Sequence, residues 1–197
     1  NSKKTISFEF FPPKKDSDLP KLYETVDRLS TYNPDFVSFT YGAGGNTRQL
    51  TTQVSKEAKL SDKFEVMSHL TCIAHNEKEI IDILKDLDLS NIENIIALRG
   101  DTPKDMNISN NNLKHATDLI EIIKSNFSNF CVAGACYPES HPESNNFEDD
   151  ILFTKMKQDK GVDFLITQLF FNNEDFLSFR EKALKHGVTI PIIPGIL

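Results

Sequence analysis

A carboxylate stands at the end of an apolar segment near the start of the chain. Within Thr5–Pro13, the residues Ile6, Phe8 and Phe10 alternate as strand residues do, so Glu9 lies on the opposite face. Prolines follow, and because proline cannot continue a strand ladder, the strand ends there. Glu9 is therefore predicted at the carboxyl end of a strand, the edge that carries function in α/β proteins. The structural alternative is a Glu that is hydrogen-bonded at a strand end or faces solvent.

A cation and an anion separated by one glycine follow the apolar segment Asn94–Leu98. Arg99 can bind phosphate or carboxylate in a forked geometry, and Asp101 can lie against a polarised ring or a cation. The alternative is that Arg99 and Asp101 form an ion pair that fastens the loop.

Polar or aromatic side chains also end other apolar segments. Tyr137 and His141 lie in a proline-bracketed loop, and this pair can stack on a flat ligand. Gln168 follows Thr167 at the end of an apolar segment, where a buried amide needs partners from the protein or a substrate. His69 is expected to be a hydrogen-bonded strand histidine rather than a base.

The glycine-rich segment Thr40–Gly45 suggests close approach of the backbone to a ligand. Its glycines do not have the G-x-G-x-x-G spacing of dinucleotide sites, and a tight turn explains them equally well.

The composition indicates one globular domain. Of 197 residues, 39% are hydrophobic and 26% are charged, which is typical of a folded soluble protein. The net charge of −7 argues against nucleic acid or an anionic membrane as the main partner. No apolar run approaches the roughly 20 residues that span a bilayer, and no signal-peptide segment precedes the first strand, so we expect a cytoplasmic protein.

The cysteines form no C-x-x-C pair and are expected to be buried thiols; they are Cys72, Cys131 and Cys136. Neither they nor the five histidines have metal-ligand spacing, so no metal site is expected. His75 is expected to be solvated.

Seven apolar segments alternate with segments of helical periodicity. The first expected strand ends before Pro12, and the others are Phe36–Tyr41, Phe64–Cys72, Asn94–Leu98, Phe130–Tyr137, Asp163–Leu169 and Thr189–Ile193. The expected helices are Leu19–Thr31, one beginning near Thr47, Asn76–Leu89, Leu113–Asn126, Phe147–Lys160 and Asn173–His186.

This alternation predicts a parallel sheet. A (β/α)8 TIM barrel is favoured over an open sheet because polar residues end many different strands, as around a ring. These residues are Glu9, Thr40, His69, Arg99–Asp101, Tyr137 and Gln168. A barrel has eight strands and usually about 250 residues. We therefore expect residues 1–197 to be a single catalytic barrel domain truncated after the seventh strand, with six helices present.

Six motifs, in this order, resemble the methylenetetrahydrofolate reductase family: SFEFFPP, FVSFTYGAGGNTR, HLTCIAH, ALRGD, AGACYPESHPE and TQLFF. The resemblance runs from Thr5 to Leu197. It implies a flavin-dependent barrel in which NADH or NADPH reduces FAD, and the reduced flavin passes hydride to 5,10-methylenetetrahydrofolate. The product is 5-methyltetrahydrofolate, which places the reaction in one-carbon and methionine metabolism.

The resemblance also implies roles for individual residues. Glu9 matches the general acid, Asp101 the carboxylate beside flavin and folate, and Gln168 the amide that contacts the substrate. The positions that match the flavin site are Thr40, His69, Arg99, Gly100, Asp101, Ala116, Tyr137, His141, Asp150 and Lys157. Phe153 and Met156 stand where bacterial relatives often have polar flavin contacts.

The residue types suit this chemistry. Opening the imidazolidine ring of the substrate requires a proton at a weakly basic nitrogen, and a Glu whose pKa is raised by an apolar setting can supply it. The ring-opened iminium is a cation, so Asp101 stabilises it where the charge appears.

Two other functions are compatible with the sequence. One is a flavin-independent barrel lyase or isomerase with Glu9 as base, and the other is a non-catalytic binding protein or an inactive fragment. The sequence does not distinguish NADH from NADPH. A homo-oligomer that binds a small folate, without nucleic acid or membrane partners, is expected.

Overall fold

The computed structural model describes residues 4–13, 15–41, 45–73, 75–101, 113–144 and 146–197. The strands are Ser7–Phe10 (β1), Phe36–Phe39 (β2), Glu65–Thr71 (β3), Asn94–Leu98 (β4), Cys131–Cys136 (β5), Phe164–Thr167 (β6) and Ile192–Ile193 (β7). The helices are Leu19–Ser30 (α1), Gly45–Leu60 (α2), Glu77–Asp88 (α3), Ala116–Asn126 (α4), Phe147–Asp159 (α5) and Asn173–Lys185 (α6), with a 3-10 turn at Asp16–Asp18 (η1).

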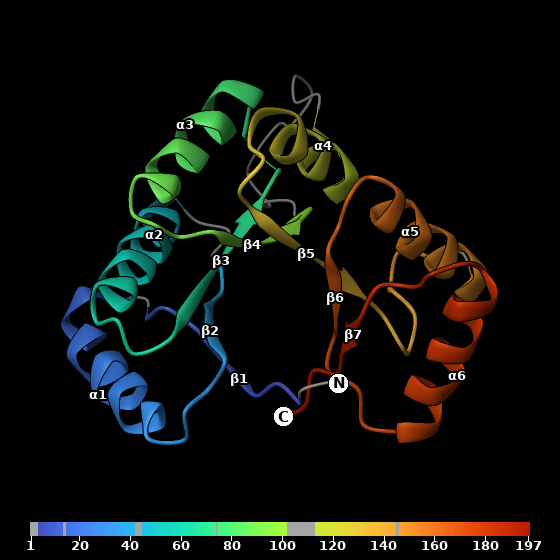
Figure 1. The fold of residues 1–197 in the computed structure, drawn as a ribbon, viewed down its shortest axis with the longest axis horizontal. Helices are drawn as coiled ribbons and strands as arrows, with labels where there is room; N and C mark the ends of the chain where they lie inside the picture. The colour runs from blue at the N-terminus through green and yellow to red at the C-terminus, as the bar shows by residue number, and fades with distance from the viewer. Residues whose placement is uncertain (1–3, 14, 42–44, 74, 102–112, 145) are drawn as a thin grey trace.

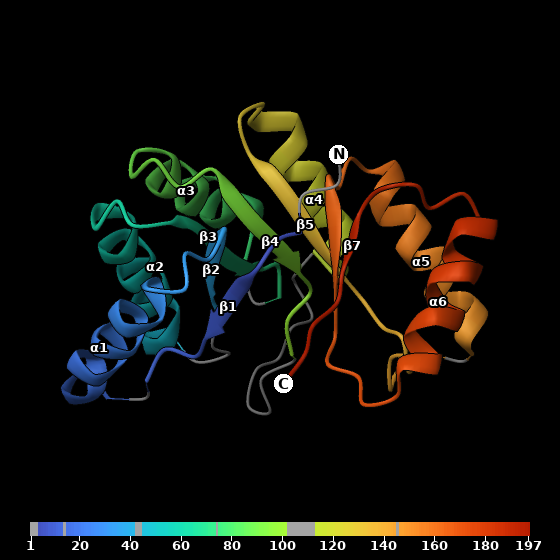
Figure 2. The ribbon, with the colours of Figure 1, turned by 60° about the horizontal axis from the view of Figure 1, so that its bottom comes forward.

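The strands form one parallel sheet in sequence order, β1 to β7. Figure 1 shows that the sheet is curved and that helices α1 to α6 follow one another around its outside. The view in Figure 2 shows the same arrangement from another side. Within the described residues, β1 and β7 do not pair with each other. The expected barrel-type α/β fold, with seven strands and six helices, is confirmed.

Two layers of apolar side chains hold the sheet. The outer layer lies between the sheet and its helices, where Phe10, Phe39 and Val54 belong to one buried cluster and a larger cluster follows β3 to β6. The inner layer is smaller and centres on Met67 and Ile96, with Ala133. Since successive strand residues point to opposite faces, the same strands supply both layers.

The first strand illustrates how this alternation places a functional residue. Phe8 and Phe10 belong to the outer cluster, and Phe10 stacks on Phe39 with ring centroids 5.6 Å apart. Glu9 is half-exposed and pairs in register with Ser38 of β2. The predicted alternation therefore turns Glu9 towards the inside of the curved sheet.

Asparagine side chains cap the N-terminal ends of three helices. Asn76 caps α3 with a reciprocal contact to Glu79, while Asn146 and Asn172 accept hydrogen bonds at the starts of α5 and α6.

The last two strands are shorter than predicted, since β6 spans Phe164–Thr167 and β7 only Ile192–Ile193. None of the helices in the described ranges combines the length and apolarity that a membrane crossing requires.

Candidate active site

A cavity of about 500 Å³ opens at the carboxyl ends of the strands. Nine of the predicted site residues line it: Glu9, Thr40, His69, Arg99, Gly100, Asp101, Tyr137, His141 and Gln168. They come from the ends of β1 to β6 and the loops that follow. Curvature of the sheet thus brings together side chains that lie up to 159 residues apart in the sequence.

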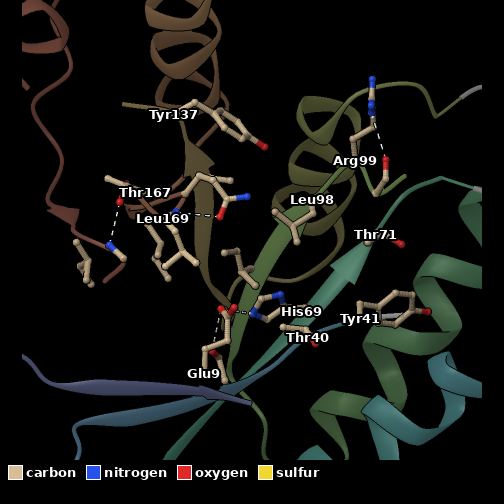
Figure 3. A pocket seen from close by; sticks show the side chains of 18 of the residues that line it. Glu9, Thr40, Tyr41, His69, Thr71, Leu98, Arg99, Tyr137, Thr167 and Leu169 are labelled. Carbon is tan, nitrogen blue, oxygen red and sulfur yellow. Dashed lines mark hydrogen bonds and ion pairs between the residues drawn. The ribbon is translucent and has the colours of Figure 1, made fainter. Parts of the chain in front are cut away.

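Glu9 of β1 and His69 of β3 point towards each other across the inside of the sheet (Figure 3). Oε2 of Glu9 lies 3.3 Å from Nε2 of His69, and the hydroxyl of Ser38 donates to the same oxygen at 3.5 Å. The His69 side chain is 7% exposed and that of Glu9 46%. His69 is therefore shielded from water, whereas the carboxylate of Glu9 remains accessible to it.

The contact with His69 sets the ionisation of Glu9. It holds the pKa of Glu9 below its ordinary value, and this effect outweighs burial, which raises it; the hydroxyl of Ser38 adds a smaller lowering. The contact is long and poorly aligned as a hydrogen bond, since Nε2 of His69 has no well-placed partner among the described residues. The expectation of a raised pKa is therefore wrong, because the imidazole of His69 lies beside a carboxylate that was expected in an apolar setting.

Arg99 pairs with a residue that the sequence did not indicate. Its guanidinium donates to both carboxylate oxygens of Glu143, at 2.5 and 2.9 Å. This fork raises the pKa of Arg99, and the charge of Asp101 adds to the effect from further away. The ion pair of Arg99 therefore joins the end of β4 to the loop after β5, and does not close on Asp101.

Gly100 lets the chain turn between these two charged residues. Its φ is +84°, and a Cβ there would lie 2.8 Å from both Thr71 and Ile73. Only glycine fits this conformation and this packing. The amide of Ile73 donates to the carbonyl of Arg99 at 2.9 Å, which fixes the turn against the end of β3.

The loop after β5 presents two rings to the cavity. The rings of Tyr137 and His141 meet edge to face, with centroids 4.7 Å apart. Nδ1 of His141 accepts a hydrogen bond from the amide of Glu143 at 3.1 Å, which leaves Nε2 to carry the proton. Burial raises the pKa of Tyr137, so its hydroxyl stays protonated at neutral pH.

Three predicted flavin-site residues do not line this cavity. Ala116 begins α4. Asp150 is buried in the first turn of α5 and accepts hydrogen bonds from the loop after β5. Lys157 donates to the carbonyl of Ala135 at 2.6 Å, and burial lowers its pKa.

The end of β6 also lines the cavity. Oε1 of Gln168 accepts a hydrogen bond from the amide of Leu169, and the amide nitrogen of its side chain carries two donor protons. The hydroxyl of Thr167 accepts from the amide of Gly195 at 2.8 Å. The segment after β7 is therefore attached to the end of β6.

Other functional candidates emerge only from the folded arrangement. The hydroxyl of Tyr41, which lines the cavity, lies 3.0 Å from Nε2 of His75. His75 is 8% exposed, so its expected solvation is wrong. Of the predicted glycine-rich segment, Gly42–Gly44 lie outside the described residues.

No group of three metal-binding side chains occurs within the described ranges. Among the described residues, Cys72 and Cys136 are buried cysteines that form no disulfide, as expected, and Cys131 is likewise unbridged but only partly buried.

Comparison with known proteins gives the family. The family model described as methylenetetrahydrofolate reductase matches residues 1–197. The 5,10-methylenetetrahydrofolate reductase of Escherichia coli is 40% identical over 192 residues, which cover 98% of this chain and 64% of the relative. A rice protein named probable methylenetetrahydrofolate reductase (NADH) is 35% identical over 206 residues, covering 98% of this chain and 34% of that protein.

A solved structure shows the same fold at low identity. It is an uncharacterized protein from Clostridium thermocellum that binds two copies of 5-methyl-5,6,7,8-tetrahydrofolic acid. It matches with a TM-score of 0.69 at 17% identity, over 96% of this chain and 65% of its own. The chain spans less than two thirds of the length of the bacterial relative described above. By the full-length match to the family model and by these relatives, the chain belongs to the methylenetetrahydrofolate reductase family.

Proposed function

We propose that the protein carrying this chain reduces 5,10-methylenetetrahydrofolate to 5-methyltetrahydrofolate, with FAD as its cofactor and NADH or NADPH as the reductant. The observation that carries the proposal is the placement of Glu9, Asp101 and Gln168 around one cavity, from the ends of three different strands. The named activities of the bacterial and rice relatives support it, as does the folate bound by the Clostridium protein.

The residues present fit a flavin. The cavity of about 500 Å³ lies in the range of roughly 300 to 1,000 Å³ that is usual for small-molecule sites. Its margin offers a guanidinium from Arg99 and an Nε2 proton from His141, and its interior offers the unsatisfied Nε2 of His69. Thr40 and Tyr137 complete the surface that would contact a planar ring. When bound, the flavin supplies the hydride for the substrate.

Glu9 supplies the proton in this proposal. The substrate's ring opens when the nitrogen that leaves the bridging carbon gains a proton, and Glu9 is the acid placed inside the cavity. In the structure its pKa is lowered by His69. Folate bound over the half-exposed side chain would displace water, and this desolvation raises the pKa of a carboxyl group. Binding of the substrate thus favours the protonated form that the reaction needs.

Asp101 stabilises the charge that develops on the substrate, and Gln168 orients the substrate. Ring opening leaves an iminium cation, and the carboxylate of Asp101 stabilises positive charge at the cavity. The oxygen of Gln168 accepts from the amide of Leu169, and its two side-chain amide protons can donate to a substrate carbonyl. The two side chains reach the substrate from the ends of β4 and β6, which lie on either side of β5 in the sheet.

One observation favours a second function. An ionised carboxylate can accept a proton as a general base, and the contact with His69 lowers the pKa of Glu9 and so keeps it ionised at neutral pH. A flavin-independent barrel lyase or isomerase would use Glu9 in this way. A non-catalytic role is less well supported, because Glu9 and Asp101 both line the cavity at strand ends.

The proposal extends to the cellular location, oligomeric state and partners of the protein. We place the enzyme in the cytoplasm as a homo-oligomer, without nucleic acid or membrane partners. A net charge of −7 supports the exclusion of polyanions. Cys72 and Cys136, which form no disulfide among the described residues, suit a reducing compartment.

The visible spectrum of the full-length protein, recorded as purified, tests the proposal. We expect flavin absorption that NADH or NADPH bleaches without oxygen and that 5,10-methylenetetrahydrofolate then restores. A protein that purifies without flavin, and does not bind added FAD, would support the lyase or isomerase instead.

A further inference from the structure

A buried histidine just before α3 bonds to a tyrosine that lines the cavity. The hydroxyl of Tyr41, which follows β2, lies 3.0 Å from Nε2 of His75. His75 is 8% exposed and does not itself line the cavity. In Figure 3 the hydroxyl of Tyr41 points away from Glu9 and His69. This hydroxyl is therefore anchored outside the part of the cavity where Glu9 and His69 meet.

The charge of Glu79 determines which nitrogen of His75 carries the proton. Nδ1 of His75 lies 3.6 Å from Oε2 of Glu79, which is longer than a hydrogen bond but within the range of an ion-pair contact. The same oxygen accepts a hydrogen bond from the amide of Asn76 at 2.9 Å, as part of the cap of α3, and this fixes the carboxylate. A negative charge on this side of the neutral ring favours a proton on Nδ1, so Nε2 accepts the hydrogen bond from Tyr41.

The main chain that carries His75 is bonded to the end of the neighbouring strand β4. The amide of His75 donates to the carbonyl of Cys72 at 3.2 Å. The amide of Cys72 donates to the carbonyl of Leu98 at 3.1 Å. The amide of Ile73 donates to the carbonyl of Arg99 at 2.9 Å. The imidazole of His75 therefore extends from a segment that main-chain hydrogen bonds hold against β4.

The main chain before Tyr41 is held as well. The amide of Thr40 donates to the carbonyl of Phe10 at 2.9 Å, and the hydroxyl of Thr51 in α2 donates to the carbonyl of Thr40 at 2.8 Å. These bonds fix the backbone but not the two side-chain torsions of a tyrosine. Packing against the larger apolar cluster restricts the ring of Tyr41, and the bond to His75 gives its hydroxyl one direction.

We propose that His75 is a positioning residue that acts through Tyr41. It accepts the hydrogen bond of the phenol and so fixes the ring of Tyr41 where the end of β2 lines the cavity, while Glu79 sets the tautomer of His75. The inference deepens the proposed function, and it rests on that function for the choice of FAD as the ligand with which the effect is measured.

Four variants of the full-length protein test this role. His75→Phe removes the acceptor and keeps a ring in the buried position, and Tyr41→Phe removes the donor and keeps the ring at the cavity. The double variant Tyr41→Phe/His75→Phe removes both halves of the pair. His75→Gln restores an acceptor, because the amide oxygen of glutamine reaches about as far from the main chain as Nε2 of histidine and can accept from a phenol.

The first measurement is the dissociation constant for FAD, from fluorescence quenching. We expect His75→Phe and Tyr41→Phe to raise this Kd by similar factors of about three to ten, on the scale of one neutral hydrogen bond. The double variant should raise it no further than either single variant, because the two groups act as a pair. His75→Gln should stay within about twofold of the unaltered protein, on the same scale.

Two exposed residues supply matched controls. Tyr32 is 68% exposed and His186 follows α6 at the surface, and neither lines the cavity. Tyr32→Phe and His186→Phe remove the same groups as the test variants and should leave the Kd for FAD unchanged. Thermal melts verify that each variant is folded, and Tyr41→Phe with His75→Gln carries the test if His75→Phe fails to fold.

The second measurement does not depend on FAD. Crystal structures of the flavin-free unaltered protein, of His75→Phe or Tyr41→Phe, and of His75→Gln report where the ring of residue 41 lies. We expect the ring to be displaced or to occupy several positions when either half of the pair is removed, and to keep its place in His75→Gln.

The outcomes separate this inference from the proposed function. An unmoved ring in the folded variants would overturn the positioning role, as would a moved ring with unchanged FAD affinity. Losses that add in the double variant would show that Tyr41 and His75 act independently, which also contradicts it. If the unaltered protein binds no FAD, the proposed function fails, while the crystal structures still decide whether His75 fixes Tyr41.

Discussion

Glu9 Oε2 and His69 Nε2 lie 3.3 Å apart, although the two residues belong to strands that are not neighbours in the sheet. β2 lies between them, and its Ser38 contributes a hydroxyl to the same carboxylate. The contact is possible because the sheet curves, which turns the inner faces of β1 and β3 towards each other (Figures 1 and 3). The proton state of Glu9 is therefore a property of the curved sheet as well as of its own strand.

The first prediction concerns Glu9→Gln in the full-length protein. We expect the reduction of folate to slow by about 10² to 10⁴-fold, the usual contribution of a positioned acid, while NADH or NADPH still reduces the flavin. Ring opening of the substrate needs a proton and hydride transfer into the flavin does not. Stopped-flow absorbance of the flavin follows each half-reaction separately.

Glu77→Gln, an exposed substitution in the first turn of α3, is the control for this experiment and should slow neither half-reaction. If bleaching by NADH or NADPH fell as far as the folate half-reaction, Glu9 would not be the acid of the second half-reaction alone.

The second prediction concerns the pKa of Glu9. In His69→Gln we expect this pKa to rise, because the largest lowering effect is lost and burial, which raises it, remains. A carboxyl whose pKa is lowered by folding adds stability above its unfolded value of about 4.3, and this stability is lost as the pH falls through the folded pKa. The variant should therefore lose less stability on acidification than the unaltered protein.

Carbon-detected NMR titration of the Glu9 carboxyl measures the pKa, and denaturant melts between about pH 3 and pH 7 measure the stability. His186→Gln, an exposed histidine after α6, serves as the control. An unchanged Glu9 titration in His69→Gln would show that His69 does not govern this carboxyl.

The position of Glu9 could be predicted from the sequence, but its ionisation could not. Alternating phenylalanines and two prolines fix its face and its place at the strand end. Its pKa depends on His69, sixty residues away, and the two meet only because of the curvature of the sheet. Local patterns report strand faces, whereas contacts between non-adjacent strands depend on the tertiary structure.

The ion-pair partner of Arg99 could not be predicted from the sequence either. The sequence places Arg99 and Asp101 two residues apart, which suggests that they pair. In the structure Gly100 turns the chain, and the fork of Arg99 meets Glu143 after β5. The two parallel N–H groups of a guanidinium bond more readily to both oxygens of a carboxylate that faces them from another loop than to a carboxylate in the same turn.

The third prediction concerns Asp101→Asn. We expect the folate half-reaction to slow by about ten- to a hundredfold, with flavin still bound, because the iminium cation loses its nearby negative charge. The same change stabilises the reduced, anionic flavin by about 1 to 2 kcal/mol, on the scale of one charge removed, so the flavin becomes a weaker hydride donor and this half-reaction slows further. Stopped-flow rates and the flavin content after gel filtration test this, and a faster folate half-reaction would contradict it.

The last prediction concerns Gly100→Ala. Alanine at a φ of +84° is strained, and its Cβ would lie 2.8 Å from side-chain atoms of both Thr71 and Ile73. We expect a loss of about 2 to 4 kcal/mol, and a melting temperature lower by about 5 to 15 °C. Relief of the clash would also move Arg99 and Asp101, so FAD binding should weaken.

Gly187→Ala is the matched control for Gly100→Ala. Gly187 has the same φ of +84°, lies after α6 and is absent from the cavity lining, and among the described residues a Cβ there would meet Lys155 alone, at 3.3 Å. It should lose stability through the same backbone strain and keep its affinity for FAD. Calorimetry and flavin titration of both variants separate the two effects. Equal loss of FAD affinity in both would mean that general destabilisation weakens the site, whereas loss in Gly100→Ala alone would show that the turn between Arg99 and Asp101 shapes it.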